Sequence, residues 1–216
     1  MPNNKRSSAH SHFEISPYKA ADKLQSIMLT EIDLSIPIVI GVTGHRYLPP
    51  QYELSLRLAI EQTLARFELA CPNSPLVLIT GMAEGADRLA ARCAFERGPR
   101  WQVGAVLALA PEEFEKDFET IESKQEFRDL LDRCTWVRPP PNENTDRPAV
   151  YCEVGLWISH HAQWLIALWD GQETNDAPGG TAWVVEVFRQ RHKGHEISLP
   201  DAGHVAHIMV QRSALI

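Results

Sequence analysis

The chain has 216 residues, enough for one domain with its own hydrophobic core. Apolar residues make up 44% and charged residues 23%, which is typical of a globular protein. A net charge of −7 gives no electrostatic basis for binding nucleic acid or an anionic membrane, and the apolar runs are too short to span a bilayer. The sequence therefore predicts a protein that uses neither as a partner.

Four cysteines are scattered along the chain without a Cys-x-x-Cys motif. This spacing disfavours a zinc site or a disulfide scaffold and fits a reducing compartment. The polar first residues show no signal peptide, so we expect a cytoplasmic protein. We interpret residues 1–34 as a flexible tail with one short helix over Pro17–Leu29, and residues 35–216 as a single domain.

Strand-like and helix-like segments alternate from Ile36 onward. The predicted strands are the run that begins at Ile36, then Leu76–Thr80, Gln102–Leu109, Thr135–Val137 and Trp164–Trp169. The predicted helices are Tyr52–Ala70, Asp87–Arg97, one that starts at Pro111, then Glu122–Arg133, Tyr151–His161 and Thr181–Arg191. This alternation predicts an α/β fold, a Rossmann-like three-layer sandwich with a mostly parallel central sheet.

Three details of this pattern lead to further predictions. In the first helix, the apolar rhythm is set by Leu54, Leu58, Leu64 and Phe67. The proline-rich run 138–148 is expected to form neither strand nor helix, and so to be a lid or a disordered flap. The tail from 196 to 211 holds two short runs that predict a β-hairpin or an added edge strand.

Ligands of parallel sheets bind beyond the carboxyl ends of the strands, so the turns that follow the strands are the candidate site. The first strand is followed by Thr43, Gly44, His45 and Arg46. Glycine lets the backbone come close to a ligand, and the planar fork of Arg46 suits a phosphate or a carboxylate. The alternative is that Arg46 is an ordinary surface arginine.

The turn after the second strand opens directly into a helix and supplies the candidate contacts Gly81, Met82, Gly85 and Asp87. Two glycines bracket this turn, which lets backbone N–H groups face an anion. Asp87 either caps the helix or accepts a hydrogen bond from a ribose hydroxyl. Glu84 is a candidate general acid or base, or else a solvated side chain.

The fifth strand is followed by a glycine-rich segment that also leads into a helix. Its candidate ligand contacts are Asp170, Gly171, Gly179, Gly180 and Thr181. A Gly-Gly-Thr sequence at a helix N-terminus offers backbone donors and a hydroxyl to a phosphate, whereas Asp170 is also a good turn former. Glu186 is a second candidate catalytic residue. The paired histidines lack an acid or cysteine cluster at ligand spacing, so no metal is expected.

Four segments in this order resemble the SLOG superfamily: Val39–Arg46, Ile79–Asp87, Leu165–Gly171 and Gly179–Thr181. That superfamily takes in the DNA-processing protein A (Smf) family, the YpsA-like proteins and the Lonely Guy phosphoribohydrolases. The resemblance implies a Rossmann-like domain that binds nucleotides or nucleotide derivatives at the strand ends. It also implies a homo-oligomer, and many bacterial members are thought to sense nucleotide signals in stress or conflict systems beside an effector protein.

Lonely Guy enzymes carry Pro-Gly-Gly-x-Gly-Thr-x-x-Glu, whereas this chain has Pro178-Gly-Gly-Thr-Ala-Trp-Val-Val-Glu186, without the third glycine. The first hypothesis is therefore a sensor module that binds a signalling nucleotide or an ADP-ribose-like ligand and uses no cofactor. The second is a phosphoribohydrolase that cleaves a nucleoside monophosphate at its glycosidic bond, with Glu186 or Glu84 as the acid or base. The third is a protein-interaction scaffold with a vestigial pocket.

Overall fold

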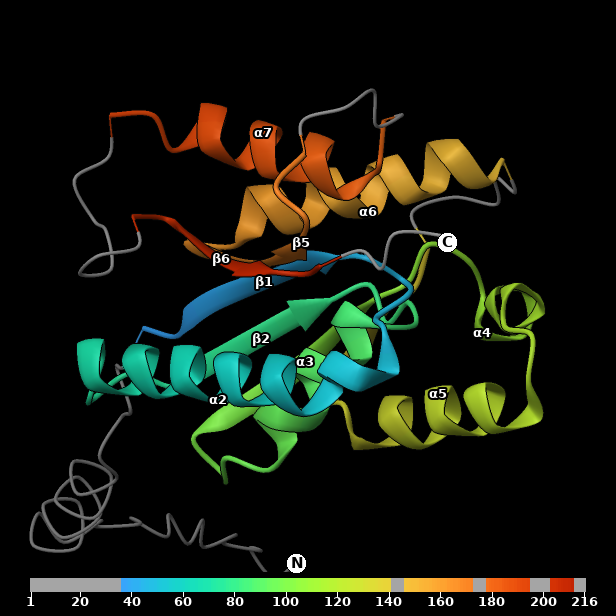
Figure 1. Ribbon diagram of the computed structural model, residues 1–216, viewed down its shortest axis with the longest axis horizontal. Coiled ribbons are helices and arrows are strands. Elements are labelled where there is room, and N and C mark those ends of the chain that lie inside the picture. The colour runs from blue at the N-terminus through green and yellow to red at the C-terminus, as the bar shows by residue number, and fades with distance from the viewer. Residues whose placement is uncertain (1–35, 141–145, 173–177, 195–202, 212–216) are drawn as a thin grey trace, which may run out of the picture. The chain divides into compact units, whose positions relative to one another are not determined.

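The computed structural model describes residues 36–140, 146–172, 178–194 and 203–211, which all fall in one compact unit, residues 35–216 (Figure 1). The predicted helix Pro17–Leu29 and the rest of the expected N-terminal tail lie outside the described residues.

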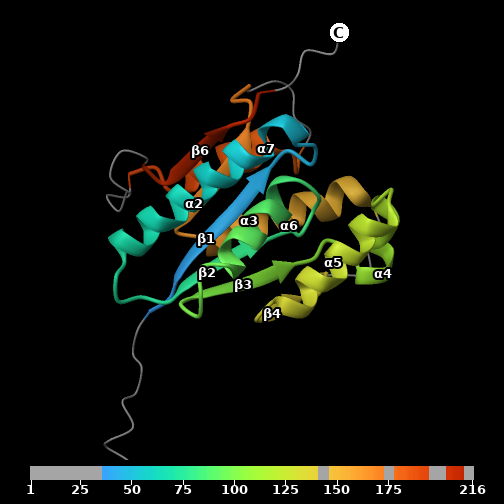
Figure 2. The same ribbon diagram turned by 60° about the horizontal axis from the view of Figure 1, so that its bottom comes forward.

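Six strands form a single sheet in the order β4-β3-β2-β1-β5-β6, and every neighbouring pair is parallel (Figure 2). The predicted α/β class is confirmed, and the sheet is wholly rather than mostly parallel in the described residues. The core strands are apolar and buried on both faces, as parallel strands between two helical layers must be. The strands are β1 (Ile38–Gly44), β2 (Leu76–Thr80), β3 (Trp101–Val106), β4 (Trp136–Arg138), β5 (Trp164–Trp169) and β6 (Val205–Met209).

Helices cover the two faces of this sheet in separate groups (Figure 1). On one face lie α6 (Arg147–His161) and α7 (Thr181–Arg191), which pack on each other and on β1. On the other lie α2 (Glu53–Ala70), α3 (Ala86–Phe95) and α5 (Ile121–Arg133), with α3 against β1, β2 and β3. Short turns of helix complete the described elements: η1 (Pro50–Tyr52), α4 (Pro111–Phe114) and η2 (Glu115–Asp117). The predicted three layers are thus confirmed.

The buried face of α2 differs from the predicted one. Leu64 and Phe67 are fully buried, as expected, but they share the core face with Leu56 and Ile60. Leu54 and Leu58 are 70% and 49% exposed. Apolar residues occur on both sides of this helix, so the periodicity alone did not identify the side that meets the sheet.

The prediction that 138–148 forms neither strand nor helix was wrong at both ends. Arg138 is the last residue of β4, and α6 begins at Arg147 and includes Pro148 in its first turn. Residues 141–145, on which the predicted lid or flap falls, lie outside the described residues. Proline fits the first turn of a helix, where its missing N–H has no intrahelical acceptor in any case. At the C-terminal end, β6 adds to the sheet edge parallel to β5, as one of the two predicted alternatives.

The turn after β2 is held from behind by Arg88, whose side chain is only 1% exposed. Its Nε donates to the carbonyl oxygen of Met82 at 3.2 Å, and its Nη1 donates to the carbonyl of Ser123 at 2.8 Å. The guanidinium also pairs with Glu126 at 3.2 Å and lies over the ring of Phe118. Burial lowers the pKa of Arg88 from its ordinary value. One buried arginine therefore ties α3, the turn after β2 and α5 together.

We expect Arg88→Met to lower the free energy of unfolding by about 3 kcal/mol, because it leaves the carbonyls of Met82 and Ser123 buried without a donor. Arg92→Met is the matched control. Arg92 lies one turn further along α3, is 32% exposed and makes exposed ion pairs, so its loss should cost about 1 kcal/mol or less. Urea unfolding followed by tryptophan fluorescence measures both, and equal losses would contradict a structural role for Arg88.

Candidate functional site

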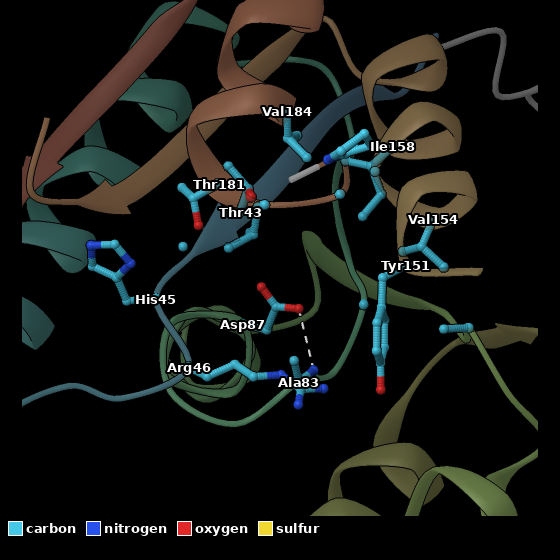
Figure 3. A pocket seen from close by; sticks show the side chains of 18 of the residues that line it. Thr43, His45, Arg46, Ala83, Asp87, Tyr151, Val154, Ile158, Thr181 and Val184 are labelled. Atoms are coloured by element: carbon cyan, nitrogen blue, oxygen red, sulfur yellow. Dashed lines mark hydrogen bonds between the residues drawn. The ribbon is translucent and has the colours of Figure 1, made fainter. Parts of the chain in front are cut away.

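The sheet order reverses direction at β1, with β2, β3 and β4 on one side and β5 and β6 on the other. In parallel sheets such a reversal leaves a crevice at the carboxyl end of the strands. A cleft of about 550 Å³ opens there, lined by the ends of β1 and β2, by α6 and by the first turn of α7 (Figure 3). Nine predicted ligand contacts line it: Thr43, Gly44, His45, Arg46, Gly81, Asp87, Gly179, Gly180 and Thr181.

Tight backbone packing fixes the turn after β1. The amide of His45 donates to the carbonyl of Leu168 at 2.9 Å, and the carbonyl of His45 accepts from the amide of Ala86 at 3.1 Å. A Cβ atom at Gly44 would lie 2.6 Å from the carbonyl oxygen of Leu168, so only glycine fits. Three distant segments therefore place Thr43 and Arg46 on the cleft.

Gly81, Ala83 and Asp87 of the turn after β2 line the cleft, whereas Met82 and Gly85 serve the fold. Met82 is fully buried in the core, at a φ of 58°. Gly85 has a φ of 77°, and a Cβ there would lie 2.5 Å from the carbonyl oxygen of His45. The candidate ligand contacts in this turn are thus Gly81 and Asp87, together with Ala83, which the sequence analysis did not select.

Asp87 is a buried carboxylate in the wall of the cleft, 8% exposed. Burial raises the pKa of its carboxyl to about 6, although hydrogen bonding and the charge of Arg46 act in the opposite direction. One oxygen accepts from the amide of Ala83 at 3.2 Å, which stabilises the turn (Figure 3). The N-cap of α3 is Gly85, so Asp87 does not cap this helix, which was one of its two predicted roles. Asp87 lines the cleft instead.

The first turn of α7 forms a wall of the cleft next to α6. Gly180 is the N-cap of α7 and supplies no side-chain cap. Thr181 follows it with 9% exposure, and its hydroxyl points into the cleft (Figure 3). No described residue forms a hydrogen bond with that hydroxyl. A hydroxyl that faces the cleft and is not bonded to the protein is available to accept from or donate to a ligand there.

Charged side chains gather at the mouth of the cleft around Asp117. Arg147 donates from Nε to Asp117 at 2.7 Å, the Tyr151 hydroxyl donates to the same carboxylate, and Arg46 lies 4.0 Å from it. Desolvation raises the pKa of Asp117, but the hydrogen bonds and nearby cations outweigh it and hold that pKa below its ordinary value. The Arg46 guanidinium also lies over the Tyr151 ring, 5.0 Å from its centre.

The sequence analysis missed Arg147 and Tyr151 because it placed the start of this helix after the proline-rich run. The available signal was the Asp146-Arg147-Pro148 sequence, in which proline occupies a position favoured at helix starts.

Several predicted residues do not line the cleft: Met82, Glu84, Gly85, Asp170, Gly171 and Glu186. Glu186 is exposed and pairs with Gln190 at 2.6 Å, since five residues place it roughly 140° around the helix from Thr181. Glu84 accepts from the Ser123 hydroxyl outside the cleft. Asp170 accepts from the amide of Gln172 at 3.1 Å, which is the predicted turn role, and lies 3.6 Å from His45.

Within the described ranges, no three His, Cys, Asp or Glu side chains are grouped so that they could hold a metal ion. None of the helices described has both the length and the apolar character needed to cross a membrane.

Comparisons with known proteins cover protein-family models, curated protein sequences and solved structures. No protein-family model and no curated protein sequence matches it. Among solved structures, it is similar to the X-ray structure of TM1055, a structural genomics target, with a TM-score of 0.42 and 14% sequence identity. The similarity covers 72% of this chain and 71% of that one. The Rossmann-like α/β fold itself is established by the parallel sheet and its two helical layers.

The raised pKa of Asp87 predicts a pH-dependent stability. The folded state binds this proton more tightly than the unfolded chain, so the stabilisation is complete below about pH 3.9 and is lost as the pH rises through about 6. Asp87→Asn removes this dependence. We expect its free energy of unfolding, relative to wild type, to increase by about 2–3 kcal/mol from pH 4 to pH 7. Urea titrations at several pH values test this, and a constant difference would contradict it.

Proposed function

We propose that this chain binds a nucleotide or a nucleotide-derived ligand, either ADP-ribose-like or a signalling nucleotide, in the cleft at the carboxyl ends of the strands. The observation that carries the proposal is the placement of Thr181, in the first turn of α7, on the same cleft as Arg46, with its hydroxyl facing the cleft. Amides in the first turn of a helix have no intrahelical acceptor, and the helix dipole favours negative charge there. These features suit a phosphate group.

The remaining walls suit the rest of such a ligand. Val42, Val154, Ile158 and Val184 provide apolar surface for a base or a sugar ring. Asp87 is placed to accept a hydrogen bond from a ribose hydroxyl. The cleft volume of about 550 Å³ falls within the range of small-molecule sites.

Membership of the SLOG superfamily is part of this proposal and is supported by the four sequence motifs, three of which contribute residues to the cleft. A role as a sensor that passes a nucleotide signal to an effector protein, as a homo-oligomer, rests on that resemblance.

The second candidate function, hydrolysis of a nucleoside monophosphate at its glycosidic bond, is favoured by a different residue from those expected. Glu186 and Glu84 lie outside the cleft. Asp87 lies inside it, and its pKa of about 6 suits proton transfer near neutral pH. If the chain is a hydrolase, Asp87 is the acid or base.

Arg46→Ala should weaken nucleotide binding by about 1.5–3 kcal/mol, because a charge-assisted contact is lost. Isothermal titration against nucleoside monophosphates, cyclic nucleotides and ADP-ribose measures this. Arg128→Ala is the control, since that arginine makes an exposed pair with Glu115 and does not line the cleft. Folded wild-type protein that binds no member of the panel would remove the proposal, and unchanged affinity in Arg46→Ala would remove Arg46 from the site.

For a binding module, incubation with AMP should release no adenine, as measured by chromatography. Release that is lost in Asp87→Asn and retained in Glu186→Gln would instead establish the hydrolase. The two variants separate a carboxylate of the cleft from one on the exposed side of α7.

A further inference from the structure

The cleft has two separate places that favour an acidic group, and Arg147 belongs to the second. Building on the proposed function, we propose that the ligand carries two acidic groups, one at the first turn of α7 beside Thr181 and the other between Arg46 and Arg147. The proposed function requires only one acidic group, bound by Thr181 or by Arg46, and does not involve Arg147. The second follows from the arrangement of charges at the mouth of the cleft.

Arg46 and Arg147 reach the mouth from different elements, the turn after β1 and the first turn of α6, and both line the cleft. Their side chains are 45% and 36% exposed, so a ligand can reach them. The surrounding charges are Lys116, Glu113 and Asp117 at the mouth, and Asp87 in the cleft wall, which interacts with Arg46. Cations and carboxylates balance here, so a further anion would be bound by the two guanidinium groups directly and not by an excess of positive charge.

Arg147 is held in a defined orientation. Its Nε donates to Asp117 at 2.7 Å, and its Nη2 donates to Glu113 at 3.2 Å. Nη1 has no acceptor among the described residues. Two carboxylates thus fix one edge of the guanidinium and leave donors for a ligand, as in arginines that bind phosphate or carboxylate through a planar fork.

The position of Asp87 explains why the two acidic groups of the proposed ligand would bind at separate places. Figure 3 shows Asp87 between Thr181 and Arg46 in the view into the cleft. A buried carboxylate repels phosphate and accepts hydrogen bonds from hydroxyls. A ribose suits this middle position, with an acidic group at either end. Two sources supply that chemistry: phosphates on two positions of one ribose, or the phosphates of a diphosphate-linked nucleotide.

The test is isothermal titration of wild type with AMP, adenosine 3′,5′-bisphosphate, ADP and ADP-ribose, and with the guanine counterparts of the first three. We expect at least one ligand with two phosphates to bind about ten-fold or more tightly than the monophosphate. Arg147→Gln should abolish that gain, measured as the ratio of the two affinities in the same variant. Arg128→Gln should keep the gain, and Arg147→Lys, which retains the charge without the fork, should keep part of it.

A gain confined to the bisphosphate assigns both groups to one ribose, and a gain confined to ADP or ADP-ribose assigns them to a diphosphate chain. The inference is overturned if the monophosphate binds and no second phosphate improves affinity, or if the gain survives in folded Arg147→Gln. The proposed function stands in both of those cases. It fails together with this inference only if none of the nucleotides binds.

Discussion

Close backbone contact between the ends of β1 and β5 and the start of α3 is the constraint on which the site depends. The amide and carbonyl of His45 bond to Leu168 and Ala86, and Gly44 and Gly85 leave no room for a side chain between these segments. A Cβ at either glycine would force the turns apart. The phosphate-binding chemistry that we propose therefore depends on tight packing at two glycines, of which Gly44 lines the cleft and Gly85 does not.

Asp87 and Arg88 are neighbours on α3 but have different roles, one in the cleft and one in the core. Successive helical side chains point roughly 100° apart, so Asp87 faces the cleft while Arg88 enters the core behind the turn. Burial shifts both pKa values toward the neutral form, up for the acid and down for the base. Glu126 favours the charged form of the buried arginine, and the bonds of Arg88 to two carbonyls hold the turn in which the buried acid lies.

The sequence analysis misplaced several residues, and these errors have the same cause. Leu54 and Leu58 fit a helical rhythm as well as the buried residues of α2 do, and only contact with the sheet separates the two faces. Glu186 follows a Gly-Gly-Thr turn, but helix geometry carries it to the exposed side. Arg147 lies far along the chain from β1, and a fold was needed to bring it to Arg46. In each case the deciding interaction is long-range.

The sequence by itself determined the alternation of buried strands and helices, the parallel sheet and the turns that meet at its carboxyl edge. It could do so because strand burial, glycine turns and helix starts depend on a few neighbouring residues. The tertiary structure alone decided that Asp87 is the carboxylate inside the cleft and that Arg147 and Tyr151 stand at its mouth beside Arg46. Those placements follow from how α6 packs on the sheet and where η2 lies, and no local pattern contains that information.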